Sequence, residues 1–134
     1  MGYYVKLTES SFRIPQTNLD EAYKRMVELK DHDDLNEKWL SWMYPNYSDD
    51  CNTAAEIFEV LRFEIEVGCG ELFITEFDSN LGREDLFLAA ICDLAEPGSR
   101  LYWRGEEGKQ WMVEYGGAKP INYKAKVEYV VVDS

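Results

Sequence analysis

The chain has 134 residues, 46% hydrophobic and 14% aromatic, and carries a formal net charge of −12. This apolar content excludes a disordered chain, and the length predicts a single domain, residues 1–134, with a sizeable core. The negative charge disfavours direct binding to nucleic acid or to a membrane surface and favours protein partners with a basic surface.

The charge is concentrated in one part of the sequence. Residues 28–93 contain 17 acidic and four basic residues, whereas the rest of the chain has nine acidic and ten basic residues. An acidic patch is therefore expected in the central half.

Cysteine usage and hydropathy indicate a cytoplasmic protein. Cys51, Cys69 and Cys92 have no CxxC spacing, and the single histidine cannot complete an ordinary zinc site with them, so we expect reduced thiols, with Cys92 in the core. Residues 1–15 lack the apolar stretch of a signal peptide, and apolar runs of about five residues are too short to span a membrane.

In chain order, alternation predicts a first strand at Gly2–Thr8, which Phe12–Ile14 continues or pairs with. A helix is expected from Asn18 to about Lys30, opened by a capping box with Glu21. Its predicted buried stripe consists of Leu19, Ala22, Tyr23, Met26 and Leu29.

Residues 31–50 are irregular, with a short helical turn around Leu35–Trp42 that Pro45 would stop. Thr53 and Glu56 form a second capping box, which predicts a helix through Leu61.

After Leu61 the spacing of the apolar residues changes from the helical repeat to an alternation of every second residue. Phe63–Val67 and Glu71–Phe77 are predicted to form a hairpin across the Gly68–Gly70 turn, and Asp78–Asn80 to break the sheet. Arg83–Ala95 is expected to be a helix.

The last third predicts strands around Leu101–Trp103 and Trp111–Tyr115, then a long strand over Tyr123–Val131. The order of elements indicates the α+β class: an antiparallel sheet, a meander at its C-terminal end, with about three helices on one face.

No catalytic residue, metal site or cofactor is predicted. Asp31–Asp34 offers hard-cation ligands but lacks the EF-hand spacing, and three neighbouring carboxylates favour a protonated His32, so a solvated acidic loop is the simpler interpretation. The cysteines lack a base other than His32, and 26 acids supply carboxylate pairs by number alone.

Two sets of residues are candidates for binding a partner. The first is a carboxylate array that could imitate nucleic-acid phosphates: Glu56, Glu59, Glu64, Glu66, Glu71 and Glu76. The second is an aromatic segment of interface-type residues: Trp39, Trp42, Tyr44 and Tyr47. The alternatives are an ordinary solvated face for the first set and a lid over the sheet for the second.

The opening Met1–Tyr4 (MGYY) and the motif W-x-G-E-x-G-x-x-W, formed by Trp103, Gly105, Glu106, Gly108 and Trp111, resemble features of small uncharacterised proteins from bacteriophages and bacterial mobile elements. The resemblance covers about residues 57–116. It implies no activity, but it suggests a small accessory protein of phage origin, acting in the host cytoplasm.

The leading hypothesis is a non-catalytic acidic protein, a phage-encoded inhibitor of host defence such as an anti-CRISPR or nuclease inhibitor, that occupies a basic nucleic-acid-binding surface. One alternative is a small-ligand or metal-dependent enzyme with a site near residues 31–47. Another is a self-assembling module that pairs through its C-terminal strand.

Overall fold

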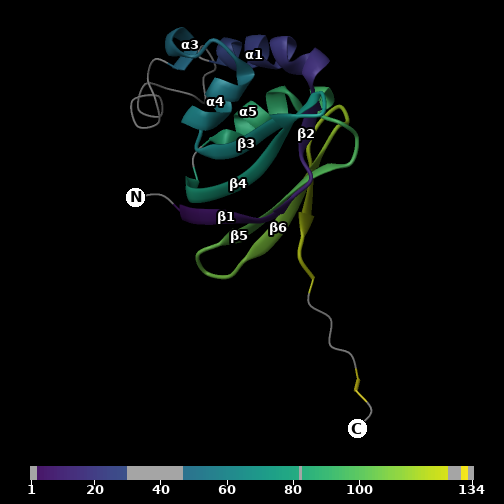
Figure 1. The fold of residues 1–134 in the computed structure, drawn as a ribbon. Coiled ribbons are helices and arrows are strands. Elements are labelled where there is room, and N and C mark those ends of the chain that lie inside the picture. The colour runs from purple at the N-terminus through teal and green to yellow at the C-terminus, as the bar shows by residue number, and fades with distance from the viewer. Residues whose placement is uncertain (1–2, 30–46, 82, 127–130, 133–134) are drawn as a thin grey trace.

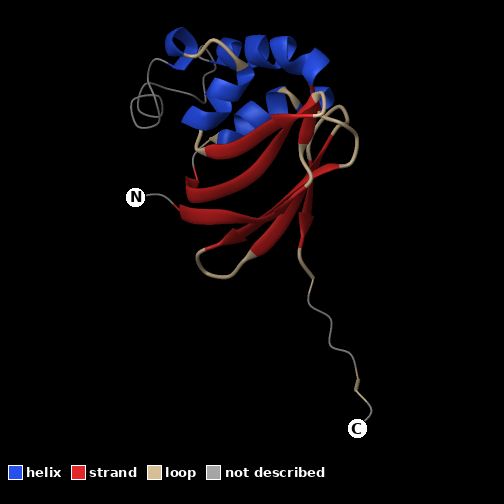
Figure 2. Ribbon diagram, in the orientation of Figure 1, coloured by secondary structure: helices blue, strands red, loops and turns tan. Residues whose placement is uncertain are grey.

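The computed structural model describes residues 3–29, 47–81, 83–126 and 131–132. Its strands form an open, seven-stranded antiparallel sheet, and its helices gather on one side of that sheet (Figure 1, Figure 2). This confirms the predicted α+β class. We call the helix-covered face of the sheet the inner face and the opposite one the outer face. None of the described helices has the length and apolar character needed to cross a bilayer.

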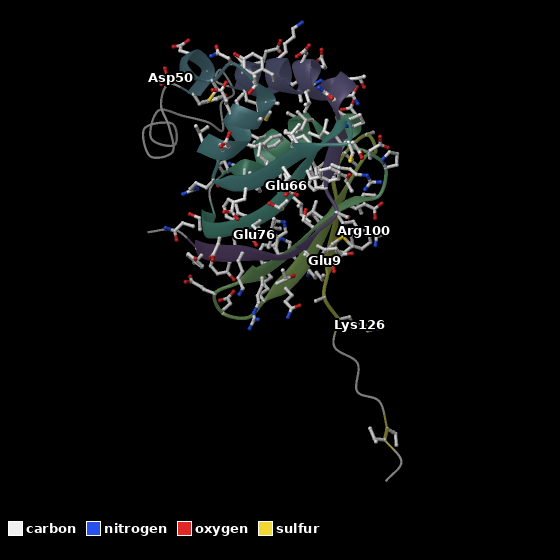
Figure 3. All side chains as sticks on the ribbon, in the orientation of Figure 1. Glu9, Asp50, Glu66, Glu76, Arg100 and Lys126 are labelled. Atoms are coloured by element: carbon white, nitrogen blue, oxygen red, sulfur yellow. The ribbon has the colours of Figure 1, made fainter. Side chains whose placement is uncertain are left out.

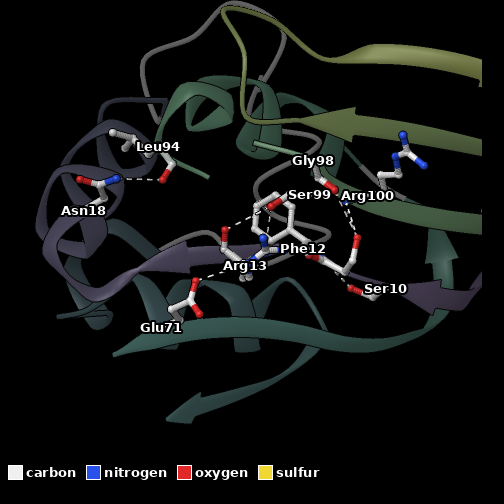
Figure 4. Close-up of polar contacts among 10 residues, drawn as sticks. Ser10, Phe12, Arg13, Asn18, Glu71, Leu94, Gly98, Ser99 and Arg100 are labelled. Carbon is white, nitrogen blue, oxygen red and sulfur yellow. Dashed lines mark hydrogen bonds and ion pairs between the residues drawn. The ribbon is translucent and has the colours of Figure 1, made fainter. Parts of the chain in front are cut away.

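The N-terminal segment contains β1 (Tyr3–Ser10), β2 (Arg13–Pro15) and, after a 3-10 turn, α1 (Leu19–Glu28). The helix begins where it was predicted, but the capping interpretation is wrong. The side-chain nitrogen of Asn18 (Nδ2) instead donates to the backbone carbonyl oxygen of Leu94 at 3.0 Å (Figure 4). This hydrogen bond connects the start of the helix to a segment far away in the sequence.

Two short helices follow, α3 (Tyr47–Asp50) and α4 (Ala54–Val60). The Thr53 hydroxyl accepts a hydrogen bond from the Glu56 amide at 3.2 Å, which confirms the predicted N-cap. The helical turn predicted around Leu35–Trp42 lies outside the described residues.

The predicted hairpin is confirmed as β3 (Phe63–Gly68) and β4 (Glu71–Leu81). Its connection has positive φ at both central residues, 53° at Cys69 and 78° at Gly70, the backbone of a type I′ turn. The break predicted at Asp78–Asn80 is wrong, because β1 pairs with this segment and carries β4 on to Leu81.

After α5 (Glu84–Ala90) and a 3-10 turn at Cys92–Leu94, the chain forms the predicted meander of β5 (Ser99–Gly105), β6 (Gln110–Tyr115) and β7 (Ile121–Lys124). The described part of the final strand ends at Lys124, and residues 127–130 of the predicted strand Tyr123–Val131 lie outside the described residues. Strand β7 lies at the sheet edge, and its four side chains are exposed.

The sheet order is β2-β4-β1-β5-β6-β7, and β3 also pairs with β4. Strand β4 therefore pairs with three strands: β2 and β3 near its start and β1 near its end. The long β4 is therefore the strand that holds the two halves of the sheet together. The core lies between the inner face and the helices, and its largest fully buried side chains are Phe12, Phe58, Phe77, Phe87, Ile14, Met26, Ile57, Leu61, Leu72, Ile74, Leu88 and Ile91.

Candidate binding surface

The β3/β4 hairpin places glutamates on the outer face because its strands alternate. Phe63 is buried among aromatic rings of the core, with its ring centroid 5.0 Å from that of Phe77. Successive side chains of a strand point to opposite faces, so Glu64 and Glu66 project away from the core, and both are exposed.

A β-bulge then brings a glutamate of β4 opposite one of β3. The register changes from Glu64 opposite Glu76 to Ile65 opposite Ile74, so Thr75 is an extra residue in β4. The bulge lets Ile74 and Phe77 both point inward although they are three residues apart. It also leaves Glu76 exposed beside Glu64.

Glu64 and Glu76 form a like-charge pair. The pKa of Glu64 is raised because its carboxyl group hydrogen-bonds to that of Glu76, and because the charge of Glu76 and partial desolvation both disfavour its ionised form. Two carboxylates directly opposite each other on neighbouring strands destabilise the sheet when both are ionised. The fold therefore carries an electrostatic cost at this position.

Several acids of residues 28–93 are neutralised by arginines. Glu71 lies 3.5 Å from Arg13 of β2 (Figure 4), and the buried Glu84 lies 2.9 Å from Arg62. Asp93 pairs with Arg25, whose hydrogen bond lowers the pKa of that carboxyl group. Glu71 thus belongs to an ion pair within the fold, not to a free carboxylate array.

The two glutamates of α4 belong to a different layer. The Glu56 carboxylate accepts a hydrogen bond from the Asn52 amide at 3.0 Å, as part of the helix start, and Glu59 is exposed. Because α4 covers the inner face, these side chains do not share the outer face with Glu64. The predicted six-residue array is therefore divided between two layers.

The aromatic candidates do not extend this surface. Trp39, Trp42 and Tyr44 lie outside the described residues, as does the acidic segment 31–34. Tyr47 is only 3% exposed; its hydroxyl donates to the Met26 carbonyl at 2.8 Å, and its ring packs edge-on against Phe87. The interpretation of Tyr47 as a partner contact is corrected: it is a core residue.

Three glutamates remain, which we call the acidic strip: Glu64, Glu66 and Glu76. None of the ion pairs in the described part of the chain includes them. Glu66 and Glu76 extend from the paired strands β3 and β4 (Figure 3). The strip can offer several ionised oxygens to a basic partner surface.

Basic residues that were not predicted as site residues lie on the same outer face. Lys6 of β1 and Arg104 of β5 are exposed and directly opposite each other. Their outward position could have been predicted, because each alternates with a buried neighbour, Val5 or Trp103. Their proximity could not, because it depends on the pairing of strands almost 100 residues apart.

The residues of the W-x-G-E-x-G-x-x-W motif have structural roles. Trp103 and Trp111 face each other across β5 and β6 and stack with ring centroids 6.3 Å apart, and Gly108 turns the chain with φ of 89°. A Cβ at Gly105 would lie 1.8 Å from the Tyr3 hydroxyl oxygen, so the opening segment and this hairpin touch.

Among the described residues, no group of three histidine, cysteine, aspartate or glutamate side chains is arranged to hold a metal ion. Comparisons with protein-family models, with curated proteins and with solved structures find no match to this chain.

Proposed function

We propose that this chain is a non-catalytic acidic binding protein that occupies a basic, nucleic-acid-binding surface of a protein partner. Following the sequence resemblance, we propose that it is a phage-encoded inhibitor of host defence acting in the host cytoplasm. The acidic strip is the contact region, in place of the larger set of glutamates and aromatic residues expected from the sequence.

The observation that carries the proposal is the opposed pair of Glu64 and Glu76. Both side chains are exposed, and no described lysine or arginine pairs with either. The hydrogen bond between the two carboxyl groups, together with the repulsion between their charges, raises the pKa of Glu64. A cationic partner would relieve this repulsion on binding. The repulsion that lowers the stability of the free protein would then add to the free energy of binding in the complex.

The geometry also suits a basic groove. Glu64 and Glu66 lie two residues apart on one strand, which spaces their side chains by roughly 6.5 Å, and Glu76 adds a charge on the neighbouring strand. This arrangement of negative charge on two neighbouring strands can lie against lysines and arginines that otherwise hold phosphates.

The test is affinity capture from host lysate on immobilised protein. The wild type is compared with the triple variant E64Q/E66Q/E76Q and with a matched variant, D20N/E28Q/D49N, which removes the same charge from exposed positions of α1 and α3. Thermal melting verifies that all three are folded.

We expect one or more nucleic-acid-binding proteins to be retained by the wild type and the matched variant, lost from the strip variant, and released by excess double-stranded DNA. Retention of the same proteins by the strip variant would refute the acidic strip as the contact region. Retained proteins that DNA does not displace would refute occupation of a nucleic-acid site.

A further inference from the structure

Strand β7 leaves one edge of the sheet open. It is the last strand in the sheet order and pairs with β6 on one side, and no strand of the described residues pairs with its other side (Figure 1). Strands β1, β5 and β6 separate it from β4, which carries Glu76 of the acidic strip. An open edge presents backbone N–H and C=O groups with which another strand can pair.

The backbone groups that face the open edge belong to Asn122 and Lys124. The Ala125 amide donates to the carbonyl oxygen of Gln110 at 3.4 Å, so residue 125 directs its hydrogen-bonding groups toward β6. In antiparallel pairing this direction alternates along a strand, which means that residues 122 and 124 direct theirs away from β6. A further strand could therefore form hydrogen bonds with both residues.

The outer face beside this edge is apolar. Tyr102, Met112 and Tyr123 lie directly opposite one another on β5, β6 and β7, so they form one row across the meander. Tyr102 and Met112 are half-buried, whereas Tyr123 is 42% exposed and Ile121, on the same face of β7, is 48% exposed. The row thus ends at the open edge with large apolar side chains in contact with solvent.

The sequence of β7 matches a second copy of itself in one antiparallel register. With the two strands centred on Tyr123, this tyrosine faces its own counterpart, and Asn122 and the partner's Lys124 form a hydrogen-bonded pair. A register centred on Lys124 would place two lysines directly opposite each other. A register centred on Asn122 would require a backbone N–H from Pro120, which proline lacks.

We propose that two copies of this chain associate through β7, with antiparallel pairing centred on Tyr123, to form one continuous sheet. The apolar row of one copy then meets the apolar row of the other across the two-fold axis, and the two Tyr123 rings shield each other from water. Such an interface uses the same surface on both copies, so the assembly closes at the dimer. This surface goes beyond the proposed function and does not depend on it.

The expected dimer is weak and reversible. The contact is a few residues long, so it buries less than the roughly 800 Å² per partner that is usual for stable interfaces. Two chains of net charge −12 also repel each other, and salt screens this repulsion. We therefore expect a dissociation constant between about 1 μM and 1 mM that decreases as salt is added. A complex formed through the acidic strip should show the opposite dependence on salt.

The experiment measures the association of the full chain at protein concentrations from about 1 μM to 1 mM, by sedimentation equilibrium and by amide chemical shifts of ¹⁵N-labelled protein. We expect a monomer–dimer equilibrium. The largest concentration-dependent shifts should occur at Asn122 and Lys124, because their amides gain hydrogen bonds in the dimer.

Tyr123→Lys is the test variant and Tyr4→Lys is its matched control. Tyr123→Lys would place two positive charges opposite each other at the axis and should weaken the dimer by about tenfold or more. Tyr4 has nearly the same exposure, 41%, but it lies on β1 in the interior of the sheet. Tyr4→Lys makes the same change in net charge and should alter the dissociation constant by less than about twofold. Thermal melting verifies that both variants are folded.

A chain that stays monomeric up to about 1 mM would overturn the proposal and leave the edge to a different protein. Association that leaves the Asn122 and Lys124 shifts unchanged, or that Tyr4→Lys weakens as much as Tyr123→Lys does, would overturn it as well. Because the experiment needs no other protein, its failure would leave the proposal for the acidic strip untouched.

Discussion

The two faces of the sheet use the same strands for different purposes. On β5, Leu101 and Trp103 point inward and are buried, while Arg100 and Arg104 point outward and are exposed. The inner face is determined by volume and packing, and it stabilises the fold. The outer face places like charges opposite each other at two positions, Lys6 with Arg104 and Glu64 with Glu76, and these pairs lower stability in the absence of a partner.

The strongest contrast between the faces is found at adjacent residues of β4. Phe77→Ala should reduce the free energy of unfolding by about 3–5 kcal/mol, because it leaves a cavity beside Phe63 and Trp103. Chemical denaturation measures the change. Glu76→Ala is the outer-face control and should cost far less. A loss below about 1 kcal/mol for Phe77→Ala would contradict the assignment of the core to the inner face.

A smaller effect is expected where the N-terminal strand meets the β5–β6 hairpin. Gly105→Ala should cost about 1–3 kcal/mol, because the new Cβ would overlap the Tyr3 ring. In a double-mutant cycle, Tyr3→Ala should remove most of that cost. Purely additive effects of the two substitutions would show that the ring and the glycine do not contact each other.

On the outer face, Glu76→Gln should slightly raise the melting temperature at pH 7, since it removes the repulsion on Glu64. The pKa of Glu64 is raised in the fold, so the wild type loses this repulsion as the pH falls through that pKa. The gain should therefore shrink at about pH 4. A gain that is equal at both pH values would mean that the two carboxyl groups do not interact.

The smallest expected change concerns the hairpin turn. Cys69 has a φ of 53°, which asparagine tolerates better than cysteine does. Cys69→Asn should therefore stabilise the protein by a few tenths of a kcal/mol without changing the charged groups of the outer face. Cys69→Val, which is disfavoured at positive φ, should act in the opposite direction in the same denaturation experiment.

Much of the fold could be predicted because its signals are local. The hairpin at residues 63–77 follows from alternation around Gly68–Gly70, and the N-cap at Thr53 follows from its own four-residue pattern. The continuation of β4 through Asp78 could not be predicted, because its polar residues are held by hydrogen bonds to β1, more than 70 residues earlier.

The candidate surface could be predicted only in part, because some of its residues follow from local patterns and others depend on tertiary contacts. Glu64 and Glu66 follow from strand alternation, but their relation to Glu76 depends on the bulge at Thr75. The spacing of Leu72, Ile74 and Phe77 departs from two at this point and could have revealed the bulge. The separation of Glu56 and Glu59 into the helix layer depends on tertiary packing, which no short pattern records.

The central claim is that a basic partner surface binds the acidic strip. It is tested most directly by the dissociation constant of a captured partner, measured across a range of salt concentrations for the wild type and E64Q/E66Q/E76Q. We predict that the wild-type complex weakens steeply with salt and that the variant binds more weakly with a shallower dependence, because screening acts on the charges that were removed. Equal affinity and equal salt dependence for the two proteins would contradict the account.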